Sequence, residues 1–264
     1  MRKSGKVHRD FEGQWNQLSR KLLNLHYYFS LKMREKKDLI AVFLVGVSIR
    51  LLPELLSWPW LIGWDTPEYV GNLKDFAVKA NPFEKSVWYG GYRLLPPLLN
   101  LLLYPFTFVI DPWYIFKVFP PILYGFELVS FYYLTEIMNI SRRARLISTL
   151  TFAFYPVSLR ISWDLHRNSL GLFFLIWLLA EIIRNRKPLR ILLSSLFTFL
   201  SNEFTFSLGF ALICFALLND LLKRSRDRWV LAVKVLAFAS GLCVFLTFLT
   251  AFNHSQLITI HNIN

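Results

Sequence analysis

Cysteine and acidic residues are both scarce in this sequence. The two cysteines, Cys214 and Cys243, lie inside apolar runs, so they offer neither a disulfide framework nor the paired spacing of a zinc site. Asp and Glu number 17 against 30 Lys and Arg, which leaves a formal net charge of +13. The sequence also lacks a glycine-rich phosphate-binding loop and a nucleophile elbow. None of the soluble enzyme classes that carry these motifs is therefore indicated.

Apolar residues dominate what is present. They make up 55% of the 264 residues, aromatic residues make up 17%, and the mean hydropathy is +0.40. A soluble domain of this composition could not bury so much apolar surface. The basic residues do not gather as in a nucleic-acid-binding face but fall in short clusters between long apolar runs. This alternation is typical of a polytopic membrane protein.

The candidate membrane spans are the apolar runs 39–57, 94–110, 113–138, 146–161, 169–183, 189–201, 204–222 and 229–250. By the positive-inside rule, basic clusters mark the cytoplasmic side, and they lie in residues 1–37, 142–145, 184–190 and 223–228. An even number of crossings must then separate residue 37 from residue 142, although three runs lie between them. The run 94–110 contains Pro96, Pro97 and Pro105, which interrupt helices, so we predict that it stays outside. Seven spans remain, with a cytoplasmic N-terminus and an external C-terminus.

The predicted fold is an all-α polytopic membrane protein in three parts. Residues 1–37 form a basic cytoplasmic arm, residues 38–252 a seven-span module, and residues 253–264 an external tail. Apolar residues at helical spacing in the arm fit an amphipathic helix on the membrane surface as well as a solvated segment. External loops are predicted at 58–112 and 162–168. In the first loop, Thr66 followed by Pro67 predicts the cap and first turn of a short helix through about Lys79.

Two external segments concentrate ionisable side chains. Asp65 directly follows the first span, where an acid can serve either as part of a helix cap or in a chemical step. The segment 160–168 holds Arg160, Asp164, His166 and Arg167 between two apolar spans. Burial of charged groups near a membrane costs free energy, so such groups usually form ion pairs or have a function. An interface collar of paired charges and a functional site explain this segment equally well.

Within the predicted spans, two carboxylates need an explanation. Glu127 lies deepest, and the sequence names no partner for it. Glu181 and Arg184 stand three residues apart, a spacing that predicts a pair on the surface of one helix.

This order of segments resembles the GT-C superfamily of polyprenyl-phosphate-dependent membrane glycosyltransferases, which includes protein O-mannosyltransferases and aminoarabinose transferases. The resemblance rests on three short pieces in matching order and sidedness: Trp64-Asp65 with Tyr69, Arg93-Leu-Leu-Pro96-Pro97, and Arg160-Ile-Ser-Trp-Asp164. It implies a seven-transmembrane-helix module over residues 38–252, with a helical first external loop. The Trp-Trp-Asp motif of the oligosaccharyltransferase branch is absent from the sequence, which favours a monosaccharide transferase.

The resemblance also implies a reaction. A sugar, such as the hexose mannose, would pass from a polyprenyl-phosphate or dolichyl-phosphate donor to an acceptor hydroxyl on the outer face of the membrane, with inversion at the anomeric carbon. Asp65 stands at the family position of the general base, with Glu68 as a nearby substitute. Asp164 matches the acid of the second external loop, and these two aspartates are the expected catalytic residues.

Further residues are implied as ligands. The donor phosphate and sugar are expected to bind Arg93, Arg160, His166, Arg167 and Glu68. A divalent cation such as Mg²⁺ or Mn²⁺, if the reaction uses one, would have Asp65, Asp164 and His166 as ligands. In that set His166 stands where the oligosaccharyltransferase branch has a second acid.

Two other classes of function are also consistent with the sequence. The chain stops just past the seventh predicted span, so it is also consistent with a truncated or accessory relative that binds lipid-linked sugar or a partner enzyme without catalysis. A small transporter with Glu127 on its path is a third alternative, although no inverted repeat is visible. The expected partners are the lipid-linked donor, membrane lipid and an acceptor protein, glycan or lipid, with no nucleic acid. The expected location is a prokaryotic cell membrane, or the endoplasmic reticulum membrane in a eukaryote.

Overall fold

The computed structural model describes residues 36–81, 86–88, 91–93, 95–184, 188–222 and 228–261. The chain divides into two units, Met1–Ala41 and Val42–Asn264. The first unit is described only from residue 36 onward, where a helix begins that continues into the second unit. Almost all of the predicted basic arm, with its expected amphipathic segment, therefore lies outside the described residues.

Four helices in the described part of the chain are long and apolar enough to cross a membrane. They are Lys36–Leu56, α4 (Pro112–Ile137), α7 (His166–Arg184) and α9 (Glu203–Leu222). The shortest has 19 residues and the longest 26, so each rises at least about 28 Å, close to or beyond the roughly 30 Å of a hydrocarbon core. These helices match the predicted spans 39–57, 113–138, 169–183 and 204–222, and the chain is a helical membrane protein.

The run 146–161 is not the single helix that we predicted. It is divided between α5 (Arg142–Phe154) and α6 (Pro156–Asp164), and Tyr155 between them has φ −68° and ψ 124°. Proline lacks the N–H that a continuing helix needs, and its ring pushes the preceding residue towards an extended conformation. Pro156 therefore begins a new helix instead of extending the old one.

The apolar run 189–201 forms a short helix, as its length predicts, whereas the helix that contains the run 229–250 is longer than expected. α8 (Pro188–Ser201) has 14 residues and rises only about 21 Å, in keeping with the short apolar run 189–201. α10 (Arg228–His261) has 34 residues and continues through the predicted boundary at residue 252. No proline or glycine follows Gly241 within α10, so nothing in the sequence interrupts it. The predicted tail is thus helical as far as His261.

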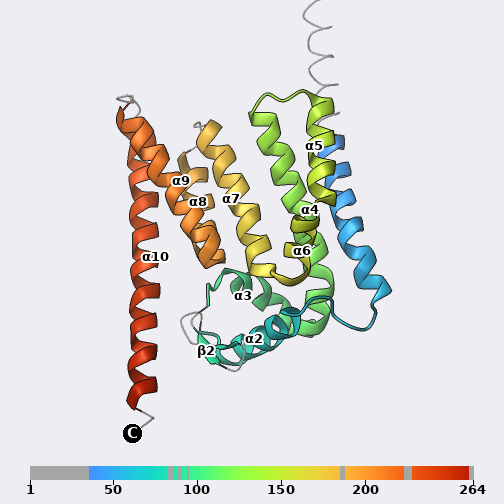
Figure 1. Ribbon diagram of the computed structural model, residues 1–264, viewed down its shortest axis with the longest axis vertical. Helices are drawn as coiled ribbons and strands as arrows, with labels where there is room; N and C mark the ends of the chain where they lie inside the picture. The colour runs from blue at the N-terminus through green and yellow to red at the C-terminus, as the bar shows by residue number, and fades with distance from the viewer. Residues whose placement is uncertain are drawn as a thin grey trace, which may run out of the picture. The chain divides into compact units, whose positions relative to one another are not determined.

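The helices of the second unit lie side by side (Figure 1). α7 packs against both α4 and α8, and α10 packs against α8 and α9. Gly171 on α7 meets Thr205 on α9 so closely that a Cβ at position 171 would collide with the threonine side chain. Small residues of this kind let helices in membranes approach each other and gain packing energy.

The segment between the first helix and α4 forms a platform beneath one end of the helices (Figure 1). The platform consists of α2 (Thr66–Lys79), an antiparallel hairpin of β1 (Ser86–Trp88) and β2 (Gly91–Arg93), α3 (Leu98–Leu103) and the 3-10 helix η1 (Tyr104–Phe108). α2 confirms the short helix predicted after Thr66, although it begins at Thr66 itself, whereas the hairpin was not predicted. α3 and η1 have 6 and 5 residues, too few to cross a membrane. Tyr69, Leu73 and Leu99 are buried in one core with Phe116 of α4, which fixes the platform to the helices.

Candidate functional site

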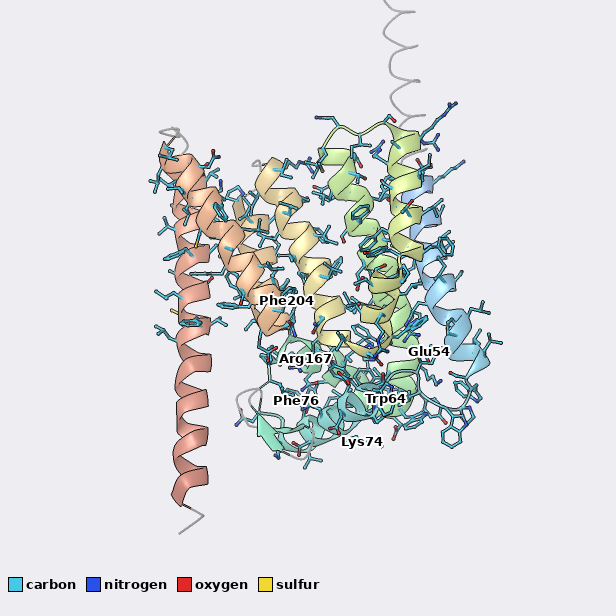
Figure 2. The ribbon with its side chains drawn as sticks, in the orientation of Figure 1. Glu54, Trp64, Lys74, Phe76, Arg167 and Phe204 are labelled. Atoms are coloured by element: carbon cyan, nitrogen blue, oxygen red, sulfur yellow. The ribbon has the colours of Figure 1, made fainter. Side chains whose placement is uncertain are left out.

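The segment 162–168, predicted as an open loop, is helical except for one residue. α6 ends at Asp164, α7 begins at His166, and Leu165 between them has φ −106° and ψ 62°. Figure 2 shows Arg167 at this junction, where α7 meets the platform. The charged side chains of the segment are therefore held at a tight turn between two helices.

Asp164 fastens the platform to this turn. It is buried, and its Oδ1 accepts a hydrogen bond of 2.6 Å from the backbone N–H of Trp64. Gly63, with φ +97°, lies against the same carboxylate. A Cβ at Gly63 would collide with Asp164 Oδ1 and with the carbonyl oxygen of Trp163. Only glycine satisfies both the left-handed backbone and the close approach.

Asp65 occupies the N-cap position of α2, but its side chain makes no capping hydrogen bond. The capping role considered for it from the sequence is thus not realised. Asp65 is half-buried as a residue, as is Glu68 one turn along α2. Because Asp164 binds the N–H of the preceding residue, the two predicted catalytic aspartates come from adjoining parts of one site.

Thr66 and His166 form the buried floor of the site. Thr66 is the first residue of α2 and not its cap, and its hydroxyl donates to the carbonyl oxygen of Ile62 at 2.5 Å. The same hydroxyl lies 3.0 Å from Nε2 of His166. The fully buried His166 ring packs between Tyr69 and Phe116, with ring centroids at 5.0 and 5.4 Å. His166 therefore acts as a packed core residue that supports α2.

Tyr69 connects the acidic and basic sides of the site. Burial raises the pKa of its hydroxyl above the usual 10.0, the neighbouring charge of Arg167 lowers that pKa, and the charge of Asp65 raises it again. The guanidinium carbon of Arg167 lies 5.8 Å from the centre of the Tyr69 ring. Tyr69 thus lies within electrostatic reach of both Asp65 and Arg167, and all three belong to one site.

The three predicted phosphate-binding arginines have different environments. Arg160 forms an ion pair with Asp164, and its side chain is 62% exposed. Arg167 is buried, with Nη1 at 3.7 Å from the carboxylate of Glu203. Arg93 lies on β2, and its side chain is outside the described residues. Of the two arginines whose side chains are described, Arg160 is thus the one that solvent or a ligand reaches more easily.

A buried chain of charges supports the site from within the helices. Glu54 pairs with Arg50 at 2.7 Å and with Lys117 of α4 at 3.0 Å. Arg50 Nε also donates to the carbonyl oxygen of Ser162 in α6 at 3.2 Å. This triad ties the first helix to α4 and α6. Arg50 and Glu54 have the i,i+4 spacing of helical ion pairs, so this pair could be predicted from the sequence.

Glu127 also has a partner that the sequence did not reveal. Its side chain is fully buried in α4, and the hydroxyl of Ser169 in α7 donates to Oε1. Gly63 was not predicted as a site residue, and Tyr69 was named only as part of a matching piece, without a role. A glycine before a helix start and an aromatic residue on its buried face are too common to identify a site.

The described residues do not form the expected metal site. Among them, no group of three or more His, Cys, Asp or Glu side chains is placed to hold a metal ion. Asp164 is already bonded to the N–H of Trp64 and to Arg160, and Nε2 of His166 faces Thr66. This arrangement does not fit the oxygen-rich ligand set that Mg²⁺ prefers.

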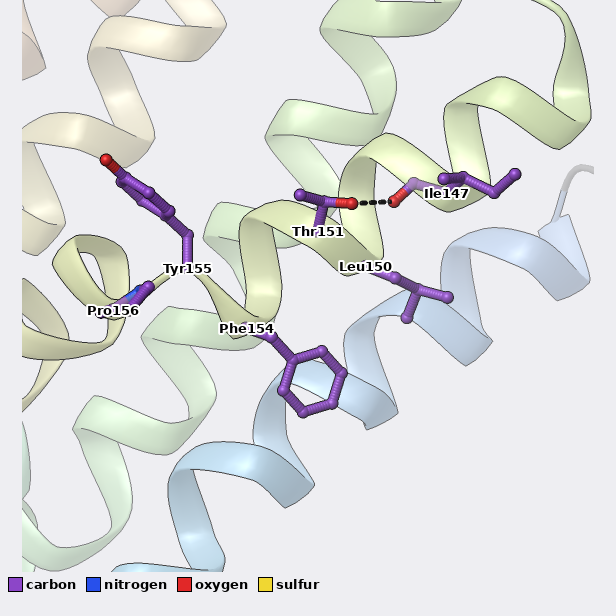
Figure 3. A pocket seen from close by; sticks show the side chains of 6 residues that line it. All are labelled: Ile147, Leu150, Thr151, Phe154, Tyr155 and Pro156. Atoms are coloured by element: carbon purple, nitrogen blue, oxygen red, sulfur yellow. Dashed lines mark hydrogen bonds between the residues drawn. The ribbon is translucent and has the colours of Figure 1, made fainter.

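A shallow apolar groove of about 460 Å³ runs along α5 to the start of α6. It is lined by Ile147, Leu150, Thr151, Phe154, Tyr155 and Pro156. In Figure 3, Leu150 and Phe154 point to one side of α5, and Tyr155 leaves from the helix break. Pro156 ends the groove, and Arg160 stands four residues further along α6. An apolar surface therefore leads to within one helical turn of an exposed guanidinium.

No protein-family model matches this chain, and no curated protein matches its sequence. The site itself combines a half-buried aspartate, an exposed arginine and a nearby apolar groove.

Proposed function

We propose that this protein is a membrane glycosyltransferase of the GT-C type, which transfers a sugar from a polyprenyl-phosphate donor to an acceptor hydroxyl. One observation carries the proposal: Asp164 bonds both to the backbone beside Asp65 and to Arg160. A potential base and a potential phosphate ligand are thereby held by one buried carboxylate. The apolar groove that ends one turn before Arg160 supplies a surface for the lipid of such a donor.

In the proposed reaction, Asp65 is the general base. Its carboxylate takes the proton from the acceptor hydroxyl while the hydroxyl oxygen forms a bond to the anomeric carbon. The bond from that carbon to the phosphate oxygen breaks in the same step, and polyprenyl phosphate leaves with both bonding electrons. Attack opposite to the leaving group inverts the anomeric centre. A hexose such as mannose is the proposed sugar.

Arg160 is the proposed ligand of the leaving phosphate. A guanidinium offers several N–H donors in a fixed fork, and charge-assisted hydrogen bonds are stronger than neutral ones. Negative charge that develops on the phosphate is stabilised by groups already oriented towards it. Arg167, whose guanidinium carbon lies 5.8 Å from the centre of the Tyr69 ring, adds positive charge. Asp164 is a positioning residue in this scheme, and no step passes through a metal ion.

The proposed topology has seven crossings. The four long helices account for four of them, and α5 with α6, α8 and α10 supply the other three. The junction of α4 with α5, the C-terminal end of α7 and the N-terminal end of α10 lie at the opposite end from the platform (Figure 1). In the sequence, these helix ends adjoin the basic clusters 142–145, 184–190 and 223–228. The positive-inside rule then puts the platform and the C-terminus outside and the N-terminus in the cytoplasm.

Reconstitution tests the proposal directly. The purified protein in liposomes is supplied with radiolabelled polyprenyl-phosphate-mannose, and the transfer of mannose to added acceptors or to water is measured. We expect turnover by the wild type, and a loss of at least about 100-fold in Asp65→Asn, which cannot accept the proton. Asp75→Asn is the matched control, because Asp75 is an acid of the same helix that pairs with Lys79 at 3.1 Å. It should retain full turnover.

Other results of the reconstitution would contradict the proposal or favour one of the alternative functions. Full turnover by Asp65→Asn would remove the base assignment. Tight donor binding by the wild type without turnover would support an accessory protein. Movement of the labelled donor across the membrane without chemistry would support a transporter.

A further inference from the structure

A second polar cluster lies at the far end of α7 and α8 from the platform. Glu181 is fully buried there, and its Oε1 accepts hydrogen bonds from the hydroxyl of Tyr133 at 3.1 Å and from Nε1 of Trp177 at 3.3 Å. Arg190 of α8 pairs with the same oxygen at 3.3 Å. Arg184 instead donates to the Tyr133 hydroxyl at 2.6 Å. The predicted exposed pair of Glu181 and Arg184 is therefore wrong, because tertiary packing buries Glu181 and gives it other partners.

An apolar cavity of about 250 Å³ opens beside this cluster, between α7 and α8. Its lining residues are Phe174, Trp177, Arg190, Leu193, Ser194 and Phe197. Two of them, Trp177 and Arg190, are also partners of Glu181. The cavity thus has walls of aromatic and aliphatic carbon and one guanidinium at its basic end.

The sequence that connects α7 to α8 is rich in positive charge. The sequence from Arg184 to Arg190 contains four basic residues and no acid. Arg190 remains 43% exposed although it pairs with Glu181. Its guanidinium shares a single carboxylate oxygen with two neutral donors, so several of its N–H groups are directed elsewhere. Arg190 therefore presents an exposed guanidinium in the lining of the cavity.

We infer that the cavity holds one acyl chain of an anionic phospholipid, with the lipid phosphate on Arg190. The cavity is smaller than the roughly 300–1,000 Å³ of pockets that enclose drug-sized ligands, so it suits a length of hydrocarbon chain and not a headgroup. Basic pockets between transmembrane helices bind anionic headgroups, and arginine matches the geometry of phosphate. The site is separate from the Asp65 region and does not depend on the proposed transfer reaction.

Native mass spectrometry of the purified full-length protein tests this inference. The probes are palmitoyl-oleoyl-phosphatidylglycerol and palmitoyl-oleoyl-phosphatidylcholine at equal concentration. We expect phosphatidylglycerol to be retained at least about five-fold more than phosphatidylcholine, and Arg190→Gln to remove this preference. Arg190→Lys keeps the charge and should retain most of it. Arg143→Gln removes an exposed arginine from α5 at the same end, and it should leave the preference unchanged.

A second pair of variants tests whether an acyl chain occupies the cavity. Leu193→Trp fills the cavity, whereas Leu189→Trp adds the same bulk one turn earlier on α8, where Leu189 is exposed and outside the cavity lining. Only the first should lower the retention of phosphatidylglycerol. Equal retention of the two lipids by the wild type would overturn the inference. The inference would also be overturned if Arg190→Gln kept the preference for phosphatidylglycerol, as Arg143→Gln is expected to do. Displacement of the lipid by inorganic phosphate alone would overturn it as well.

Discussion

The Oδ1 atom of Asp164 lies 2.6 Å from the backbone nitrogen of Trp64, one hundred positions earlier in the chain. This contact holds the start of α2 against the junction of α6 and α7. It also gives Asp164 two partners, because Arg160 pairs with the other carboxylate oxygen. Asp164 therefore helps to set the position of the platform relative to the helices.

Replacement of Asp164 by alanine should loosen the platform. The N–H of Trp64 would lose its carboxylate acceptor, and a hydrogen bond to a charged group contributes about 1.5–3 kcal/mol to the free energy of unfolding. Asp164→Asn keeps an acceptor oxygen and should cost less. Thermal unfolding in detergent measures the stability, and hydrogen exchange at residues 63–66 reports the docking. Equal exchange in the wild type and Asp164→Ala would show that Asp164 does not hold this turn.

Gly63→Ala should destabilise the protein through backbone strain and a steric clash. The φ of +97° at Gly63 is unfavourable for alanine, and the new methyl group would collide with Asp164. We expect a loss above about 1 kcal/mol. Gly71→Ala is the control, because a Cβ at Gly71 of α2 meets nothing within 4 Å and alanine stabilises helices. Its melting temperature should stay the same or rise, and equal losses in both variants would contradict the clash.

The buried triad of Arg50, Glu54 and Lys117 predicts an order of stabilities. Glu54→Gln leaves two buried cations without their shared carboxylate, which should cost about 3–5 kcal/mol. Lys117→Met keeps the Arg50–Glu54 pair at 2.7 Å and should cost less. Melting temperatures of the two variants in one detergent give the comparison. A lower melting temperature for Lys117→Met would show that Glu54 is not the centre of the triad.

Thr66 and His166 should be energetically coupled across the floor of the site. Thr66→Val removes the hydroxyl that lies 3.0 Å from His166 Nε2, and His166→Phe keeps a ring between Tyr69 and Phe116 without that nitrogen. A double-mutant cycle should show a coupling energy of about 0.5–3 kcal/mol. The cycle Thr66→Val with Thr151→Val is the control, because Thr151 belongs to the groove on α5. Additive effects in the first cycle would contradict the contact.

Tyr69 should make stability depend on pH in the alkaline range. Burial raises its pKa in the folded protein above 10.0, so the folded state favours the protonated hydroxyl. This stabilisation is complete below the pKa of the unfolded chain and is lost as the pH rises through the folded pKa. Above about pH 10 the melting temperature of the wild type should fall more steeply than that of Tyr69→Phe. Parallel curves would show that Tyr69 does not contribute.

The sequence determined the membrane character of this protein and much of its secondary structure. Four long apolar runs became helices of at least 19 residues, and the Thr66-Pro67 signal located the start of α2 to within one residue. These features depend on neighbours along the chain, because hydropathy and turn chemistry act locally. Even the break at Tyr155 follows from a local rule about proline, which was available in the sequence and was missed.

Only the tertiary structure decided which polar groups meet. The contacts of Asp164 with Trp64, His166 with Thr66 and Lys117 with Glu54 join residues far apart in the chain. Each depends on how helices pack, and a buried charge takes whichever partner the packing brings near. For the same reason Glu181 became a buried acceptor and not half of a surface pair. The sequence alone could thus identify Asp65 and Asp164 as candidate residues, while the fold gave them different environments. Asp65 is half-buried at the N-cap of α2, whereas Asp164 is buried and binds the backbone N–H of Trp64.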